Sequence, residues 1–547
     1  MRLTWKGLHD RDAWEAAGIR LPAFDPEEVA ERTRKNPVWV HFGVGNIFRI
    51  FMGTIADDLI EAGEADRGIT GIETFDFDVV DKIHRKCDNL ALCVTMHPDG
   101  KKNMRVAGSL TETVAARPGD AAALARIREI FRSPSLQLVS CTITEKGYEL
   151  KDPQGEYLRF IKPALEQGPE AAHASAMTLI AAMLKERYEA GAAPLAFVSM
   201  DNVSENGKKF RESVLEVADI WQEKGLLSAE AAAYIRDESR ISFPWSMIDK
   251  ITPRPDDGVG KSLTEAGVED METVITSKRT YIAPFVNAEG PQYLVVEDSF
   301  PNGRPAFEKA GVYMTDRETV NASERMKVTV CLNPVHSALG PYGVLLGMER
   351  FSDVFADPDL RLLAERVSFG EGMQVVKDPG IISPAAFLDE LMTVRFPNAY
   401  IPDTPQRLCT DISQGLGVRF GVTVRAFCER DGDASALQGI PLAIAGWLRY
   451  LIGVTDDGQA YELAPDPLNA GFREDLLRGG IELGRPESLK DQLQPILSNE
   501  SIFGIDLYAA GIGETIEEIF RREISGYGMV RRTLRETAES WRCITEE

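Results

Sequence analysis

The sequence predicts an α/β protein in which a doubly wound, mostly parallel sheet is followed by a mostly α-helical part. Short β-like runs alternate with helical patterns in the first half of the chain, and a Gly-x-Gly turn follows the first strong run. From about residue 306 onward the strand signals fade and amphipathic helical patterns dominate. Because 547 residues are too many for one hydrophobic core, we predict two domains, 1–285 and 286–547.

The first strand and the turn after it predict a dinucleotide-binding, Rossmann-type site. Residues 38–42 form an apolar run that leads into the turn, and a helical pattern follows to about residue 62. Such a turn places backbone N–H groups and a positive helix end against a pyrophosphate. Because Phe48 replaces the third glycine of the usual fingerprint, an ordinary strand-to-helix turn is the alternative. We assign to cofactor binding Gly43, Gly45, Asn46, Phe48 and Arg49, the last as a positive charge for the phosphates.

Two acidic residues after the next strand bear on the choice of nucleotide. The β-like segment 68–75 ends in Asp76-Phe-Asp78. A carboxylate about 20–30 residues after the glycine turn commonly binds the adenosine ribose hydroxyls and disfavours a 2′-phosphate. We therefore predict NAD as the cofactor, with Asp76 or Asp78 on the ribose. Two solvated acids at the start of a helix are the alternative.

Two further strand ends carry polar motifs. Segments 136–144 and 196–200 are β-like and alternate with the helical stretches 119–132 and 171–190. Ligands on such sheets bind beyond the carboxyl ends of the strands. We therefore add Thr142, Glu145 and Lys146 to the cofactor-binding set and place Asn202 at the second strand end.

A short apolar segment in the second half carries three polar groups suited to catalysis. Lys327, Asn333 and His336 lie within ten residues of otherwise largely apolar sequence. A lysine held in an apolar setting has a pKa lowered toward neutrality, which suits a general base. An amide and an imidazole can bind a substrate oxygen through hydrogen bonds. A lysine on the solvated side of a helix, with a core histidine nearby, is the alternative.

Composition and charge limit the partners. With 61 basic and 85 acidic residues the net charge is −24, which repels phosphate backbones and anionic membranes. We therefore expect a small-molecule ligand, with neither nucleic acid nor membrane as a partner. Seven cysteines without a Cys-x-x-Cys pair, and a start without an apolar signal core, predict reduced thiols in the cytoplasm. The six histidines are too scattered to predict a metal site.

An ordered series of motifs resembles one family. In chain order they are Thr144-Glu-Lys-Gly-Tyr148, Asp201-Asn202, Asn206-Gly207, Phe243-Pro-Trp-Ser-Met-Ile-Asp249, Glu297-Asp-Ser-Phe-Pro-Asn-Gly-Arg304, segment 324–338 and segment 395–414. Together they resemble the polyol-specific long-chain dehydrogenases, the mannitol dehydrogenase family, over about residues 36–530. The wording at 331–336 is similar to the D-mannonate oxidoreductase (fructuronate reductase) branch of that family.

The resemblance implies metal-free hydride transfer between a nicotinamide cofactor and a polyol or sugar-acid carbon. Lys327 matches the catalytic acid/base, and Asn202 and Asn333 match amides that stabilise an alkoxide-like oxygen. His336 matches a ligand of a substrate hydroxyl, and Asp249 matches a carboxylate near the lysine. The resemblance also implies that the Rossmann-type NAD-binding domain precedes a mostly helical substrate-binding domain.

The spacing after the lysine departs from the family. Six residues lead from Lys327 to Asn333, where relatives such as mannitol dehydrogenase have five. On a regular helix the nine steps from Lys327 to His336 would turn these side chains about 180° apart. We therefore predict a one-residue π-bulge or a break between them, associated with Pro334, which lacks a backbone donor.

A second departure concerns substrate binding. Eight residues beyond Arg407 the family often has a substrate-binding lysine, and here that residue is Gly415. Arg407 keeps its match, and Arg419 is the nearest substitute for the missing charge. We assign Arg407, Arg395 and Arg419 to substrate binding, together with Asn202 and His336, because a uronate carboxylate suits arginine. Surface or interdomain ion pairing is the alternative for Arg395 and Arg419.

The resulting hypothesis is an NAD-dependent oxidoreductase that interconverts D-fructuronate and D-mannonate. One alternative keeps the chemistry and changes the substrate to tagaturonate/altronate or to mannitol/fructose. Another is a catalytically silent NAD-binding relative, which the two departures would favour. A metal-dependent dehydrogenase would need clustered ligands that the sequence lacks. The sequence predicts neither the physiological direction nor the oligomeric state.

Overall fold

The strands occupy the amino-terminal part of the chain. The computed structural model describes residues 1–478 and 480–545, and in this part every named strand ends by Thr315. The strands are β1 Ile19–Arg20, β2 Trp39–Phe42, β3 Ile69–Glu73, β4 Ala91–Met96, β5 Lys102–Ala107, β6 Leu110–Ala115, β7 Leu138–Cys141, β8 Leu195–Ser199, β9 Ile241–Ser242, β10 Ser246–Asp249, β11 Val274–Ile275, β12 Tyr281–Ile282, β13 Phe285–Glu289, β14 Tyr293–Glu297 and β15 Tyr313–Thr315.

Helices occur along the whole chain. The first part contains α1 Arg11–Ala16, α2 Pro26–Lys35, α3 Gly53–Glu61, α4 Phe77–Lys82, α5 Ala121–Arg132, α6 Lys162–Gln167, α7 Ala176–Glu189, α8 Asn206–Glu223, α9 Ala229–Arg236, α10 Asp257–Glu265 and α11 Arg317–Met326. The second contains α12 Asn333–Leu345, α13 Phe351–Ala356, α14 Pro358–Glu365, α15 Pro384–Glu390, α16 Pro405–Leu408, α17 Ile412–Leu416, α18 Val422–Asp431, α19 Gly439–Tyr450, α20 Asn469–Arg478, α21 Gln494–Leu497, α22 Glu500–Phe503, α23 Gly513–Glu523 and α24 Met529–Thr545.

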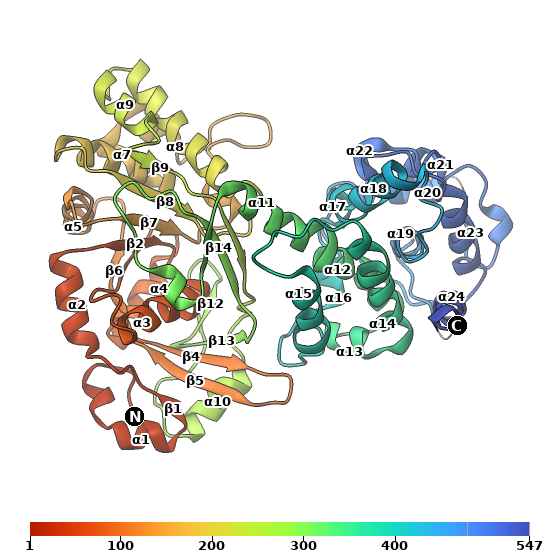
Figure 1. Ribbon diagram of the computed structural model, residues 1–547, viewed down its shortest axis with the longest axis horizontal. Helices are drawn as coiled ribbons and strands as arrows, with labels where there is room; N and C mark the ends of the chain where they lie inside the picture. The colour runs from red at the N-terminus through yellow and green to blue at the C-terminus, as the bar shows by residue number, and fades with distance from the viewer. Residues whose placement is uncertain (479, 546–547) are drawn as a thin grey trace. The chain divides into compact units, whose positions relative to one another are not determined.

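A six-stranded sheet of order β6-β3-β2-β7-β8-β9 forms the centre of the first of two units, Met1–Asn321 (Figure 1). All of its neighbouring strands pair in parallel. The strand order reverses between β2 and β7, which is where ligands bind in doubly wound sheets. The prediction of a Rossmann-type parallel sheet is therefore confirmed.

Each face of this sheet is covered by its own core. Val40 and Phe42 of β2 pack with apolar side chains of α5, α7 and α8. Trp39 points to the other face, where the apolar side chains of α3 and of the segment before it lie. Because both faces are buried, β2 is apolar along most of its length, as parallel strands usually are. Helix α5 begins after Asp120, whose side chain accepts a hydrogen bond from Ala123 N.

Three smaller sheets accompany the main sheet. Their orders are β1-β5-β4-β13, β10-β14-β15 and β11-β12. Strands β13 and β14 pair with β4 and β10, so residues 285–297 belong to the first unit. The compact units divide after Asn321, later than the boundary near 285 that we predicted from the sequence, because these late strands return to earlier sheets.

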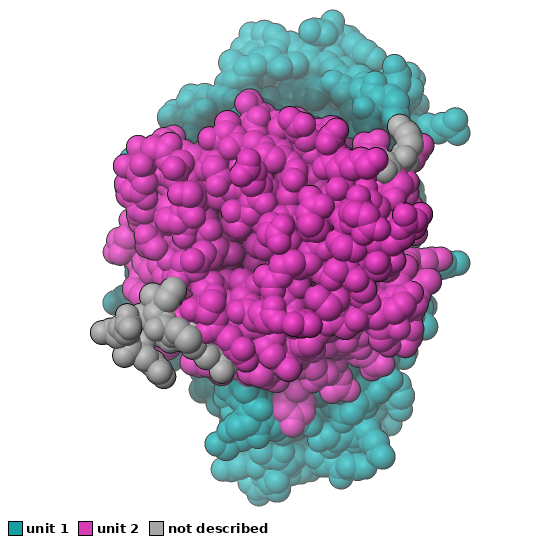
Figure 2. All heavy atoms as spheres, turned by 90° about the vertical axis from the view of Figure 1, so that its right-hand side faces the viewer, with its two compact units in different colours: residues 1–321 teal, residues 322–547 magenta. Residues whose placement is uncertain are grey.

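The second unit, Ala322–Glu547, is helical in its described part; Figure 2 colours the two units separately. Every residue of α19 is buried, and α12 packs against it. Gly446 permits this contact, because a Cβ there would lie 2.4 Å from Cε2 of Tyr342 in α12. In the described residues, no helix combines the length and the apolar character that a membrane crossing would need.

Candidate active site

The glycine turn after β2 has the conformation and the open space that a bound pyrophosphate needs. Gly43 has φ = +89°, and a Cβ there would lie 2.2 Å from the Thr142 carbonyl oxygen. No side chain other than hydrogen fits that position. A Cβ at Gly45, in contrast, would meet nothing within 4 Å, so the backbone is open to an approaching ligand.

The residues after this turn are placed differently from our expectation. Arg49 is fully buried: its Nη1 donates to Ala283 O at 2.6 Å and its Nη2 to Asn46 Oδ1 at 2.7 Å. Burial lowers the pKa of Arg49 to about 10. The guanidinium thus ties the turn to the segment between β12 and β13, and in this structure its charge is buried rather than presented to a phosphate site. Phe48 is buried and stacks on His41, with ring centroids 4.7 Å apart.

The acidic residues at the end of β3 and directly after it have different partners. Glu73, which the sequence analysis missed, accepts hydrogen bonds from Val44 N and from the N–H groups of residues 74–76. It therefore holds the glycine turn to the end of β3. Asp76 is buried; its Oδ2 accepts from Thr276 Oγ1 at 2.7 Å, and its Oδ1 has no hydrogen-bond partner among the described residues. Asp78 pairs with Lys82 and accepts from Ser277 N.

The loop after β7 is fastened to the end of β8 by a buried carboxylate. Asp201 accepts from Ile143 N and Thr144 N, each at 2.9 Å, and from the Tyr148 hydroxyl at 2.6 Å. Thr144 has φ = +62°, a strained conformation for a residue with a Cβ. Strained backbone conformations are common at ligand-binding sites, and they persist only where surrounding interactions hold the backbone in place. Asp201 supplies those bonds.

The three cofactor candidates in this loop lie around the same strand end. Thr142 Oγ1 is 2.9 Å from His41 Nε2, which joins the loop to β2. Glu145 and Lys146 are exposed, and Glu145 pairs with Lys209 at 2.8 Å. Burial lowers the pKa of His41 to about 3, so its ring is neutral at physiological pH. The loop thus presents polar side chains beside the glycine turn, where the fold places a ligand.

Asn206 connects the two catalytic candidates of the first unit. Its Nδ2 lies 3.2 Å from Asp201 O and 2.9 Å from Ser246 O, and its Oδ1 accepts from Ser246 N at 3.0 Å. Ser246 begins strand β10, which ends in the buried Asp249. Asn202, next to Asp201, is exposed at the end of β8. The Asn206 bridge therefore fixes the strand that carries Asp249 to the loop that carries Asn202.

The predicted irregularity after the lysine is confirmed, but it lies before Pro334, which stands in the first turn of α12. Residues Lys327–Cys331 form a π-helical turn, in which Leu332 N donates to Lys327 O at 3.0 Å, and α12 begins at Asn333. The π-helical turn takes up one residue without adding its rotation to the helix. Lys327 therefore lies about 80° from His336 around the axis, and not about 180°. Lys327 is buried, so its amine lies out of bulk solvent, as the sequence predicts for an acid/base.

His336 lies between aromatic rings and cationic groups. Its ring centroid is 5.0 Å from that of Phe351 and 5.3 Å from that of Phe396. Partial burial of its ring lowers the pKa of His336 to about 3; Asp403 opposes this shift, and three arginines add to it. These arginines are Arg395, Arg407 and Arg419. The imidazole is therefore neutral and can donate and accept hydrogen bonds at the same time.

The second unit thus brings together all the substrate-binding arginines that the sequence predicts. They come from three elements: Arg395 ends the π-helical turn Leu391–Arg395, Arg407 lies in α16, and Arg419 lies in the π-helical turn Gly417–Gly421. Arg407 forms a two-pronged ion pair with Asp403. The sequence analysis gave no role to Asp403, Phe351 or Phe396, which the structure places near His336, although Phe396 and Asp403 lie in the quoted motif segment 395–414.

The candidates are divided between the units. The cofactor set, Asn202 and Asp249 lie in the first unit, whereas Lys327, Asn333, His336 and the arginines lie in the second. Among the described side chains, no group of three or more histidine, cysteine or acidic residues could hold a metal ion.

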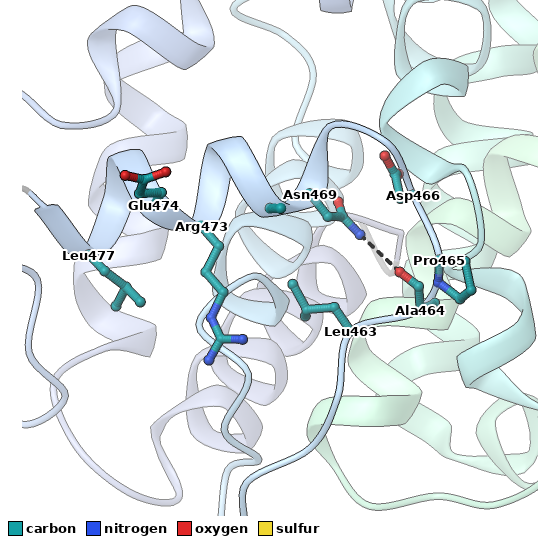
Figure 3. Close-up of a pocket in the computed structure, with 9 residues that line it drawn as sticks. Leu463, Ala464, Pro465, Asp466, Asn469, Arg473, Glu474 and Leu477 are labelled. Carbon is teal, nitrogen blue, oxygen red and sulfur yellow. Dashed lines mark hydrogen bonds between the residues drawn. The ribbon is translucent and has the colours of Figure 1, made fainter. Parts of the chain in front are cut away.

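A separate pocket of about 770 Å³ lies in the second unit between residues 463–466 and α20 (Figure 3). Asn469 and Arg473 line it, and the Asn469 Nδ2 donates to Ala464 O at 3.5 Å. It contains none of the predicted site residues. Its wall supports α17, because Asp466 accepts from Ser413 N at 2.9 Å and from Ser413 Oγ at 2.6 Å.

Two family models match the chain: the mannitol dehydrogenase Rossmann domain over residues 38–309 and the mannitol dehydrogenase C-terminal domain over residues 319–521. The chain belongs to the mannitol dehydrogenase family. It is therefore an oxidoreductase, in agreement with the names of its relatives. The resemblance seen in the sequence motifs is confirmed.

Members of this family match the chain from end to end. A D-mannonate oxidoreductase of Thermotoga maritima is 48% identical over 539 residues, which cover 98% of this chain and 99% of the relative. A mannitol 2-dehydrogenase of Cereibacter sphaeroides is 28% identical, covering 92% of this chain and 96% of the relative.

Solved structures in this family share the fold. The substrate-free D-sorbitol dehydrogenase has a TM-score of 0.78 at 25% identity, covering 95% of this chain and 97% of that chain. The Pseudomonas fluorescens mannitol 2-dehydrogenase, in a ternary complex with NAD and D-mannitol, has a TM-score of 0.70 at 26% identity and covers 99% of both chains.

Proposed function

We propose that this protein is an NAD-dependent oxidoreductase that interconverts D-fructuronate and D-mannonate by metal-free hydride transfer. The observation that carries the proposal is the cluster of Arg395, Arg407 and Arg419 around the neutral His336, in the unit that also holds Lys327. A cationic pocket suits a sugar acid better than an uncharged polyol. The end-to-end similarity to a D-mannonate oxidoreductase supports the same substrate.

The residues of the first unit suit a dinucleotide. Gly43 has the required positive φ, Gly45 leaves an open space for the pyrophosphate, and the unpartnered Asp76 Oδ1 is an acceptor for a ribose hydroxyl. An acceptor at this place favours NAD over NADP, because a 2′-phosphate would be repelled. A bound dinucleotide supplies the hydride for the substrate carbonyl carbon.

Each of the other groups has a part in proton transfer or binding. In the reduction of fructuronate, Lys327 gives a proton to the carbonyl oxygen as the carbon gains hydride; in the oxidation of mannonate it takes the proton back. Amide N–H groups of Asn202 and Asn333 stabilise the negative charge that develops on this oxygen. The neutral His336 binds a neighbouring substrate hydroxyl. Asp249 is assigned to the surroundings of the lysine.

We place the protein in the cytoplasm. The six cysteines whose side chains are described, at 87, 93, 141, 331, 409 and 428, are all free thiols. Free thiols that are mostly buried suit a reducing compartment.

The substrate is tested by NADH oxidation at 340 nm with fructuronate, tagaturonate and fructose supplied separately. We expect fructuronate to give the highest kcat/KM. A preference for tagaturonate would support the role of the arginines in binding a carboxylate but would show that the substrate is the other epimer. Preference for fructose would contradict the role of the arginines, and binding of NADH without turnover of any of the three would contradict the proposal.

A further inference from the structure

Among the described residues, Arg419 has a hydrogen bond and no ion pair. Its Nη1 donates to the Oγ of Ser337, the residue after His336, at 2.7 Å. No carboxylate among the described residues lies within 4.0 Å of its guanidinium, whereas Arg407 is paired with Asp403. A guanidinium carries five N–H donors, so most of those of Arg419 remain for a ligand.

This guanidinium is also partly removed from water. Arg419 is of intermediate exposure, and its pKa is lowered by burial, with Asp411 acting in the opposite direction. Holding a cation away from solvent without a paired anion is unfavourable. An anion that binds beside His336 would relieve this cost.

The position of Arg419 depends on the missing side chain at residue 415. A Cβ built on Gly415 would lie 2.5 Å from Arg419 Nε, 2.7 Å from Cζ and 3.0 Å from Cδ. Helical side chains point back toward the amino terminus and cover the residue about one turn before them. The Arg419 side chain therefore lies across the bare backbone at Gly415, and any other residue there would displace it.

The surrounding structure fixes both ends of this short stretch. Helix α17, which contains Gly415, is held at Ser413 by Asp466. The π-helical turn Gly417–Gly421 packs closely on α22, since a Cβ at Gly421 would lie 1.8 Å from Phe503 O. These contacts hold the backbone on both sides of Gly415, so the flexible side chain of Arg419 is the part expected to move.

We propose that Gly415 and Arg419 act as one specificity element, in which the bare Gly415 seats the Arg419 guanidinium beside His336 to bind the carboxylate of a sugar-acid substrate. This inference rests on the proposed function and adds a residue to it. Gly415 is a positioning residue, because it touches the arginine and not the substrate.

A double-mutant cycle on kcat/KM for fructuronate tests the pair. Arg419→Ala should lower kcat/KM by roughly 10- to 150-fold, the range of one lost charged hydrogen-bonding partner. Gly415→Ala should cause a loss in the same range, because its methyl group displaces the guanidinium. The double variant should be no worse than Arg419→Ala alone, since the two changes remove the same contact. Losses that multiply, or a fully active Gly415→Ala variant, would overturn the inference.

Chemical rescue separates binding from a structural role. Guanidinium ion added at millimolar concentration should restore part of the activity of Arg419→Ala. It should restore none in the double variant, because the added Cβ at residue 415 occupies the space of the Arg419 guanidinium. Gly471→Ala is the matched control, because this helical glycine has nothing within 4 Å of an added Cβ. If Gly415→Ala yields no folded protein, rescue of Arg419→Ala alone decides: its presence supports the inference and its absence overturns it.

Failure of the proposed function and failure of the Gly415–Arg419 pair give different results. If the wild type reduces no uronate, the proposed function fails and this inference fails with it. If the wild type reduces fructuronate but the cycle is additive and guanidinium does not rescue, only the Gly415–Arg419 pair is refuted.

Discussion

At the scale of single residues, buried charged and polar groups hold the backbone near the predicted cofactor site. Glu73 binds the glycine turn, Asp201 binds the loop after β7, and Arg49 joins the turn to Ala283, just before β13. Glu73 and Asp201 each satisfy several backbone N–H groups, and Arg49 satisfies one backbone carbonyl and the Asn46 side chain. In these three cases the buried charge supports the backbone around the predicted site.

Arg49 provides a direct test of this distinction. We expect Arg49→Met to lower the free energy of unfolding by about 2–4 kcal/mol, because Ala283 O and Asn46 Oδ1 lose their buried donor. The dissociation constant for NADH should change less than tenfold in the folded fraction. Urea unfolding and fluorescence titration measure the two quantities.

The control for this variant is Arg85→Met, which removes an exposed ion pair with Asp81 and should alter stability by less than about 1 kcal/mol. A large loss of NADH affinity without a loss of stability in Arg49→Met would show that Arg49 contacts the phosphates directly.

At the scale of elements, π-helical turns recur where the candidate residues lie. They contain Arg49, Lys327, Arg395 and Arg419, in the turns Phe48–Met52, Lys327–Cys331, Leu391–Arg395 and Gly417–Gly421. A π-turn inserts one residue into a helix and re-aims the side chains before it, which is why such turns are frequent at functional sites. A fifth, Arg366–Glu371, contains none of the predicted site residues.

Adding a further residue to the Lys327 turn should abolish catalysis and spare the fold. We expect an alanine inserted after Val328 to turn Lys327 by about 100° relative to α12, with kcat falling at least ~10³-fold. Circular dichroism should show unchanged helix content. An alanine inserted after Phe369 in the fifth turn is the matched control and should keep the activity per folded molecule. Equal losses from both insertions would argue against a special role for the Lys327 turn.

The bridge between β8 and β10 carries a second prediction at this scale. Asn206→Ala should lower the free energy of unfolding by about 2–4 kcal/mol, because it leaves Ser246 N and two carbonyl oxygens without their buried partner. Because the bridge also fixes Asn202 relative to Asp249, kcat should fall in the protein that remains folded. Thermal unfolding and initial rates measure both effects, and an unchanged kcat would mean that the bridge serves stability alone.

At the scale of the whole molecule, two buried neutral histidines connect stability with pH. His41 and His84 are fully buried, and burial lowers the pKa of each to about 3, below the ordinary value of 6.5. Between these pH values the unfolded chain binds more protons than the folded one. Their contribution to stability is therefore complete above pH 6.5 and is lost as the pH falls, by up to about 1.4 kcal/mol per pH unit for each.

Replacing one of them should change this slope. We expect His84→Gln to unfold with a free energy that falls less steeply between pH 6.5 and pH 4.5 than that of the wild type, by about 1.4 kcal/mol per pH unit. Comparing the two proteins at each pH cancels the opposite effect of Asp57, whose pKa burial raises to about 6. Parallel pH profiles would show that His84 is protonated in the folded state.

Features of the fold that depend on local spacing could be predicted from the sequence, whereas those that depend on distant contacts could not. The four predicted strands of the parallel sheet and the irregular turn after Lys327 could be found, because each depends on local spacing. The burial of Arg49 and the support by Asp201 could not, because they depend on partners distant in the chain. The unit boundary differed for the same reason: β13 and β14 return to sheets formed earlier.

The most direct test of the central claim is the rate of NADH oxidation with fructuronate for the wild type and for Lys327→Ala. We expect turnover by the wild type and a fall in kcat of at least ~10³-fold in the variant, with NADH binding retained. A variant within tenfold of the wild type would contradict the assignment of Lys327 as the acid/base.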